Sequence, residues 1–81
     1  MNTSKVTDMT RMFEQCRKLV FVPDLATSNV TTINSMFYYT TALTDGNVRL
    51  IGKKSGVNVQ WAINGSGLTR VPFFNANGQP I

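Results

Sequence analysis

Four carboxylates and one thiol are the side chains of this 81-residue chain that could carry chemistry. Paired carboxylates can act as general acid and base, and a thiolate can act as a nucleophile or a metal ligand. The chain contains no histidine, so it cannot form a Cys/His nucleophile pair or a mixed Cys/His zinc site by itself. The acids are dispersed, and no acid–base pair is predicted. We therefore expect no enzymatic activity, no metal and no cofactor from Asp8, Glu14, Asp24, Asp45 and Cys16.

The positive charge of the chain is spread out. Eight Lys and Arg against four acids give a net charge of +4, with no basic run longer than Lys53-Lys54. Nucleic-acid binding calls for a clustered basic face, so we do not expect it. Lys53-Lys54 could bind phosphate or an acidic partner, or could lie in a solvated loop. Charged residues make up only 15%, below a typical value of about 25%, and such a surface suits contact with other protein.

Size and termini indicate a chain that depends on neighbours. A domain this short hides only about 60 to 65% of its unfolded surface, and a single cysteine allows no internal disulfide. The N-terminus opens polar, without the apolar core of a signal peptide, and no apolar run approaches the roughly 18 residues that a membrane span needs. We expect no export signal and no membrane insertion, and we expect stability to come from packing or assembly.

An internal repeat organises the chain and must position the charged residues and the cysteine named above. A stretch that begins at Thr3 returns at Thr27, with Met12-Phe13 matched by Met36-Phe37, and a third, shortened copy ends at Val71-Pro72. A period between about 20 and 50 residues is typical of stacked repeats. The sequence predicts one domain over 1–81, with copies at about 3–26, 27–52 and 55–74 and a C-terminal tail at 75–81.

Each copy is predicted to contain one short helix and one short strand. Apolar residues at steps of three, three, one and three predict helices over Val6–Cys16 and Val30–Tyr39. The run Leu19–Val22, closed by a proline, predicts a strand, and an Asp45-Gly46 turn signal predicts that the second strand is displaced or bulged. The expected fold class is α/β: a short leucine-rich-repeat solenoid of about three copies, with short helices on one side and a narrow parallel sheet on the other.

The apolar stripes of these copies predict the repeat core. Helical spacing favours burial between copies, although a stripe rich in Met and Phe could also form a groove for a partner. Cys16 could be a redox or metal-binding thiol, but its place on the stripe favours a core role. The predicted core consists of Val6, Met9, Met12, Phe13, Cys16, Leu19, Val30, Ile33, Met36, Phe37, Leu43 and Leu68.

Five aromatic residues are the candidates for contact with a partner. Tyr38 and Tyr39 replace polar residues of the first copy, and exposed tyrosines are favoured at interfaces. Trp61 stands where the first copy has a solvent-facing arginine, so it is predicted to be either a cap over the stack or an interface anchor. Phe73 and Phe74 are predicted either to cap the core or to dock into a neighbour.

The motif Thr-Ser-Asn/Lys-Val-Thr-x-x-x-x-Met-Phe-x-x-Cys-x-x-Leu resembles the BspA-like leucine-rich repeat of bacterial surface proteins, in its variant with a Met-Phe pair. The resemblance covers roughly residues 3–72, strongly in the first copy and weakly in the third. It implies adhesion or protein–protein contact on cell surfaces, and related repeats also resemble segments of bacteriophage structural proteins.

Two departures from that family shape the expected function. Surface proteins with this repeat carry many copies, a secretion signal and an anchor, whereas three copies and neither accessory are visible here. We therefore expect a structural or protein-binding subunit of a virion, such as a capsid decoration or tail component, held by copies of itself or by a larger assembly. The alternative is a fragment or small relative of a bacterial surface adhesin that binds host protein at the cell surface.

Overall fold

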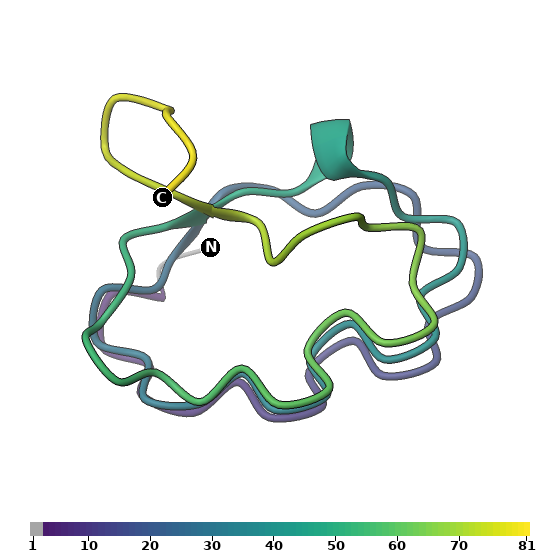
Figure 1. Cartoon of the computed structure of the whole chain (residues 1–81), viewed down its shortest axis with the longest axis horizontal. Coiled ribbons are helices and arrows are strands. Elements are labelled where there is room, and N and C mark those ends of the chain that lie inside the picture. The colour runs from purple at the N-terminus through teal and green to yellow at the C-terminus, as the bar shows by residue number, and fades with distance from the viewer. Residues whose placement is uncertain (1–2) are drawn as a thin grey trace.

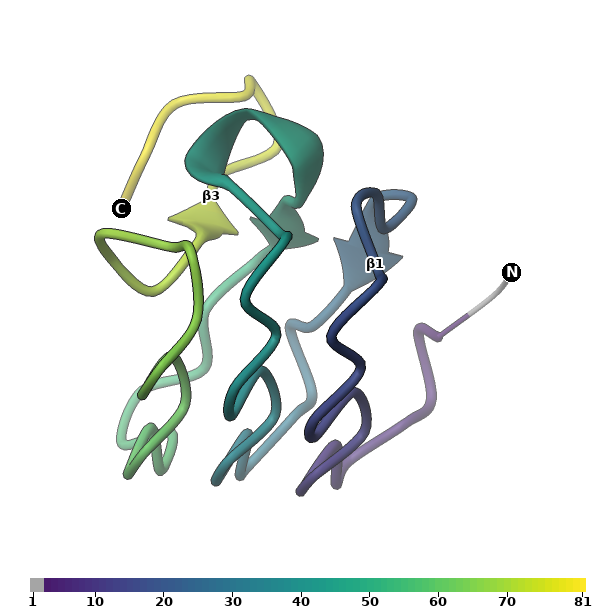
Figure 2. The same ribbon diagram turned by 90° about the vertical axis from the view of Figure 1, so that its right-hand side faces the viewer.

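The chain makes three passes around one core, and successive passes lie side by side. In the computed structural model, which describes residues 3–81, we define the passes as residues 3–26, 27–52 and 53–74. Figure 1 shows the passes nearly superposed, and Figure 2 shows the first pass and the C-terminal tail at opposite ends of the stack. The first two residues of the predicted domain 1–81 lie outside the described residues.

A narrow parallel sheet forms one side of the stack. Its strands are β1 (Leu25–Ala26), β2 (Leu50–Ile51) and β3 (Phe73–Phe74), in the order β1-β2-β3. Leu25 pairs with Leu50, which pairs in turn with Phe73. The predicted parallel sheet is therefore confirmed.

The first strand is not where the sequence predicted it. The run Leu19–Val22 forms no strand, and β1 begins only after Pro23. Proline has no N–H to give to a ladder, and the ladder starts beyond it, where the Leu25 N–H donates to the Arg49 carbonyl at 3.1 Å. A proline that appeared to close a strand in fact precedes one.

The second pass contains the short helix η1 (Asp45–Asn47), a single turn of 3-10 helix. The sequence predicted a displaced strand here because of the Asp45-Gly46 signal, and the structure agrees. The path from Leu43 to Leu50 is one residue longer than the path from Leu19 to Leu25. The short helix takes up this additional length, so that β1 and β2 still pair.

The predicted helices Val6–Cys16 and Val30–Tyr39 are wrong, because residues 3–81 contain no α-helix. Tight turns replace them: the N–H of Met12 donates to the carbonyl of Met9 at 3.3 Å, and the N–H of Cys16 to that of Phe13 at 3.1 Å. The third residue of each such turn has a left-handed backbone, as a type II turn requires. These residues are Arg11, Gln15, Ser35, Tyr39, Trp61 and Gly65, with φ between 57° and 71°.

Hydrogen bonds between passes explain why turns form instead of a helix. We call residues 9–16, 33–40 and 59–66 the turn segments. In the first of them, alternate N–H groups point to the second pass: Met9 donates to Thr32 at 3.0 Å, and Phe13 to Met36 at 2.9 Å. These amides are thus unable to make helical bonds within their own segment. An apolar pattern with a four-residue turn period resembles the 3.6-residue period of a helix closely enough to mislead.

The core lies between the sheet and the turn segments, and the middle pass is the best buried. Val30, Ile33, Met36, Phe37 and Leu43 are fully buried. The rings of Phe13 and Phe37, one pass apart, stack with centroids 5.8 Å apart. Predicted core residues Met9 and Leu68 are also buried, together with residues outside the predicted core: Val22, Leu25, Val48, Leu50 and Ala62.

Two residues of the first pass that were predicted to lie in the core are exposed. Met12 is 39% exposed and Cys16 is exposed, whereas both were expected to be buried. Val6, Phe13 and Leu19 are only partly buried. Within residues 3–81 the first pass has a neighbouring pass on one side only, and its side chains are correspondingly more exposed.

Candidate functional site

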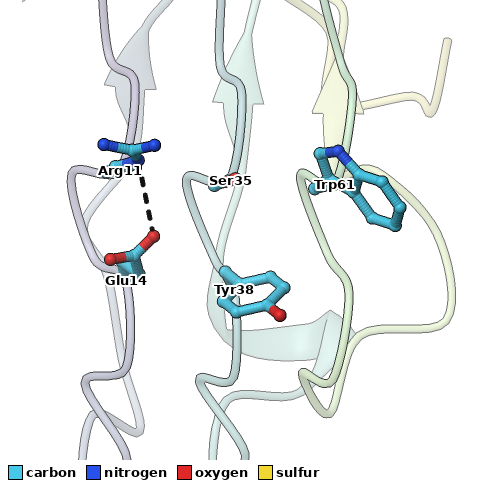
Figure 3. Close-up of a pocket in the computed structure, with 5 residues that line it drawn as sticks. All are labelled: Arg11, Glu14, Ser35, Tyr38 and Trp61. Atoms are coloured by element: carbon cyan, nitrogen blue, oxygen red, sulfur yellow. Dashed lines mark ion pairs between the residues drawn. The ribbon is translucent and has the colours of Figure 1, made fainter.

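A shallow hollow crosses all three passes on the outer side of the turn segments. Its volume is about 280 Å³, and it opens to solvent. Figure 3 shows one pair of lining residues from each of the first two passes and a single aromatic residue from the third. The lining residues are Arg11, Glu14, Ser35, Tyr38 and Trp61.

The turns place these residues in two rows. Arg11, Ser35 and Trp61 occupy the left-handed position of the same turn in consecutive passes. The N–H of Arg11 donates to the Asn34 carbonyl at 2.9 Å, and the N–H of Ser35 to the Gln60 carbonyl at 3.0 Å. These bonds between passes fix the spacing of the first row. Arg11 and Trp61 are exposed, whereas Ser35 between them is buried.

The hollow combines charged and aromatic groups. Arg11 Nε lies 3.6 Å from Glu14 Oε2, and the arginine side chain is 70% exposed. Exposed pairs of this kind contribute only about 0.2 to 1 kcal/mol, so both groups can pair with a ligand instead at little cost. On the other side of the hollow, Trp61 is 53% exposed. Such a surface can accept a side chain by stacking and a charge by pairing.

Tyr39 supports the hollow from beside it. Its ring meets that of Tyr38 edge to face, with centroids 4.5 Å apart, and the Arg17 guanidinium lies 5.5 Å from its centroid. It also lies over Gly65, where an added Cβ would come within 2.4 Å of the ring. Tyr38 therefore lines the hollow, while Tyr39 packs beside it and stays 38% exposed.

Phe73 and Phe74 do not belong to any exposed surface. They form β3 and are buried, and Phe73 is part of the main hydrophobic cluster. The C-terminal tail folds back over this strand: Phe74 pairs antiparallel with Pro80, and the Ile81 N–H donates to the Phe73 carbonyl at 3.0 Å. Their predicted role as partner contacts is corrected, and the alternative of closing the core describes them.

Three carboxylates are engaged in local or inter-pass contacts away from the hollow. Asp24 accepts two hydrogen bonds from Arg49, at 3.1 and 2.6 Å. Asp45 accepts from the hydroxyl and the backbone N–H of Thr69, and these bonds lower its pKa. Hydrogen bonds from Thr10 lower the pKa of Asp8 in the same way. Of the acids, only Glu14 lines the hollow; Asp8 bonds within its own turn, and Asp24 and Asp45 bond to the next pass.

Metal and membrane sites are not found in the described part of the chain. Residues 3–81 hold no cluster of three or more Cys, Asp or Glu side chains that could bind a metal ion. No helix within them has the length and apolar character that crossing a bilayer would take.

The structure brings together two of the five aromatic candidates, Tyr38 and Trp61, and adds three residues that sequence reasoning missed. The predicted helix placed Arg11 and Glu14 on a solvent face, and no pattern in the sequence marked Ser35. The repeat itself carried the signal. Ser35 follows Arg11 by the same interval as Tyr38 follows Glu14, so lining residues recur at the offset of the repeat.

Comparison with known proteins gives a family but no named relative. Neither the curated proteins nor the solved structures yielded a match. A family model described as "Mycoplasma protein of unknown function, DUF285" matches residues 1–62, which is more than half of the chain. The chain therefore belongs to the DUF285 family.

Proposed function

We propose that this chain is a non-enzymatic, protein-binding module, and that the hollow beside Tyr38 and Trp61 is its contact surface. One observation carries the proposal. Trp61 keeps about half of its surface exposed next to Tyr38, in a hollow lined by all three passes. An indole exposed in this way is an established kind of interface anchor.

The shape and composition of the hollow favour a protein ligand over a small molecule. Its volume of about 280 Å³ lies just below the usual range of small-molecule pockets, about 300 to 1,000 Å³. Tyrosine, tryptophan and arginine are the residues enriched at protein interfaces, and all three line it. The net charge of +4 favours an acidic partner segment with an apolar anchor.

A second proposal concerns the type of repeat that the three passes form. We infer that the three passes are turns of a BspA-like leucine-rich-repeat solenoid. The inter-pass hydrogen bonds and the parallel strand pairing support this reading, as does the Met-Phe pair repeated at 12–13 and 36–37. In such a stack, equivalent positions form rows, and rows of exposed residues make a ligand surface.

Two locations are compatible with a binding module. The sequence favoured a virion subunit, with a bacterial surface adhesin as the alternative. The family description names Mycoplasma, which is compatible with either location, so the virion subunit stays the first proposal and the surface adhesin the alternative. Mass spectrometry of peptides released by mild proteolysis of intact cells, set against that of purified phage particles, distinguishes the two.

Selection from a displayed library of random short peptides tests the binding surface. The wild-type chain should enrich peptides that share an acidic and an apolar position. Trp61→Asn is the informative variant, because asparagine tolerates the left-handed backbone of this position. Its affinity for the enriched peptides should fall at least tenfold, since loss of an anchoring side chain commonly costs about 2 kcal/mol.

Phe21→Ala is the matched control. Phe21 is also an exposed aromatic residue, but it does not line the hollow, so its loss should leave peptide affinity unchanged. The proposal is overturned if no peptide pattern is enriched, or if Phe21→Ala weakens binding as much as Trp61→Asn.

A further inference from the structure

The N-terminal end of the stack presents a row of backbone acceptors. In the second pass, the carbonyls of Thr32, Asn34, Met36 and Tyr38 accept N–H groups of the first pass, at 2.6 to 3.0 Å. Within residues 3–81, their first-pass counterparts accept no hydrogen bond. These are the carbonyls of Asp8, Thr10, Met12 and Glu14.

The C-terminal end presents the complementary row of donors. In the second pass, alternate N–H groups of the turn segment donate to the third pass, for example Ile33 to Asn58 and Phe37 to Ala62, both at 2.8 Å. The third-pass counterparts have no acceptor among the described residues. These are the N–H groups of Val59, Trp61, Ile63 and Gly65.

On the side of the stack formed by the turn segments, which we call the turn side, the two ends therefore differ in their hydrogen-bonding groups. In an ordinary sheet edge, donors and acceptors alternate, so two like edges can pair. Here the carbonyls at 8, 10, 12 and 14 form a row of four acceptors at one end, and the N–H groups at 59, 61, 63 and 65 form a row of four donors at the other. Two N-terminal ends would place acceptor against acceptor, and two C-terminal ends would place donor against donor. Only contact between unlike ends satisfies both rows.

We propose that two copies of this chain associate head to tail. The N–H groups at 59, 61, 63 and 65 of one copy donate to the carbonyls at 8, 10, 12 and 14 of the next. The register follows from the chain's own passes, because Asp8, Thr32 and Asn58 are aligned by bridges. The second copy takes the place that a neighbouring pass takes inside the molecule.

Apolar side chains at the two ends fit the same contact. Met12 at the N-terminal end and Val59 at the C-terminal end are each 39% exposed. Their second-pass counterparts, Met36 and Ile33, are fully buried because a pass lies on either side. A head-to-tail neighbour covers Met12 and Val59 in the same manner, which adds hydrophobic stabilisation to the hydrogen bonds.

The tail restricts this contact to the turn side. Residues 75–81 fold back along β3, with Phe74 paired to Pro80, and Figure 2 shows the tail at the C-terminal end of the stack. The strand side of that end is therefore occupied. A heterologous contact that continues the stack in one direction leaves a free end on each pair of copies, so the expected association is stepwise and dependent on concentration.

Single charges at the two ends test the proposal by sedimentation velocity over a concentration series. Met12→Glu disables the N-terminal end, and Val59→Glu disables the C-terminal end. Each variant alone should remain monomeric where the wild type associates. An equimolar mixture should form a dimer containing one copy of each, because each variant keeps the end that the other has lost.

Val20→Glu is the matched control. Val20 is 58% exposed, more than Met12 or Val59. It follows Leu19 as Thr44 follows Leu43, and Thr44 is exposed even in the middle pass. The position therefore faces outward, and this variant should associate like the wild type. Backbone amide NMR spectra establish that each variant is folded.

Several outcomes overturn the proposal. These are a wild-type chain that stays monomeric at every concentration, a Val20→Glu variant that dissociates as the end variants do, and a mixture that fails to form the 1:1 dimer. This test of association is independent of the peptide-binding test, because Trp61→Asn removes the indole and keeps the backbone N–H that the head-to-tail contact uses. That variant should lose the peptide ligand and still associate.

Discussion

Met12 and Met36 occupy the same position in consecutive passes, yet Met12 is 39% exposed and Met36 is fully buried. Both follow the same turn, closed by hydrogen bonds from Met12 to Met9 and from Met36 to Ile33. The difference comes from their neighbours, since Met36 has a pass on each side and Met12 has one. Burial in this chain is thus decided by position in the stack as well as by residue type.

Alanine at the two methionines should therefore have unequal effects on stability. Met36→Ala removes a side chain from a closed core, where such truncations cost about 2 to 5 kcal/mol. Met12→Ala should cost under about 1 kcal/mol, because much of that side chain already contacts water. Urea unfolding followed by circular dichroism gives both values. Equal losses would show that the end of the stack is covered in solution.

Glycine at a left-handed position should be tolerated or stabilising. Gln15 has φ of 58° and is exposed, and this backbone costs an L-residue about 1 to 2 kcal/mol. Gln15→Gly removes that cost and loses about 0.4 to 1 kcal/mol to unfolded-chain entropy, so the net gain is between about 0 and 1.6 kcal/mol.

Two comparisons control this experiment. Gln15→Val should destabilise, because a β-branched residue resists positive φ. Lys18→Gly, at an exposed position without positive φ, should also destabilise. Thermal unfolding midpoints rank the three variants. A Gln15→Gly variant that melts below Gln15→Val would refute the left-handed assignment.

Asp45 should make the stability depend on pH. Its pKa is lowered from the ordinary value of 3.8, chiefly by the hydroxyl of Thr69. A carboxyl with a lower pKa in the folded state stabilises the fold above its unfolded pKa, and loses this contribution as the pH falls through its folded pKa. Asp45→Asn should therefore narrow the stability difference between pH 7 and pH 2.

The lowered pKa of Asp8 acts in the same direction, so Asp8→Asn is a parallel variant and the double variant should show the smallest pH dependence. Unfolding midpoints measured across this range give the comparison. An Asp45→Asn chain with the full wild-type pH dependence would show that the contact with Thr69 does not form.

Cys16 should react with thiol reagents in the folded protein. Its side chain is exposed, whereas Thr40, its counterpart in the middle pass, is fully buried. At low concentration, labelling without denaturant should proceed at nearly the rate seen in urea. A native rate slowed by orders of magnitude would support the core position that the repeat pattern predicted for this residue.

The sequence alone predicted those features that depend on the repeat. The constant offset between copies placed Leu43 after Leu19 and Met36 after Met12, and it predicted a parallel sheet. It also indicated that Trp61 takes the place of Arg11, and the two residues do share one left-handed position. A repeat forces equivalent residues into rows, and rows can be read from one sequence.

The local structure of each pass could not be read in the same way. The apolar steps of Val6, Met9 and Met12 fit a helix and a chain of four-residue turns almost equally well. What separates them is whether amides such as that of Phe13 bond within the segment or to the next pass, and this depends on a neighbour in the following copy of the repeat. Likewise, Cys16 is exposed because, within residues 3–81, the first pass has a neighbouring pass on one side only. Residue type alone does not reveal this.

Amide hydrogen exchange at low protein concentration tests most directly that hydrogen bonds between passes hold the turn segments. The N–H groups of Ile33, Ser35, Phe37 and Tyr39 should be protected, because each donates to the third pass. Their counterparts at Val59, Trp61, Ile63 and Gly65 should exchange rapidly, because the described chain offers them no acceptor. Equal protection of the two sets would contradict the account.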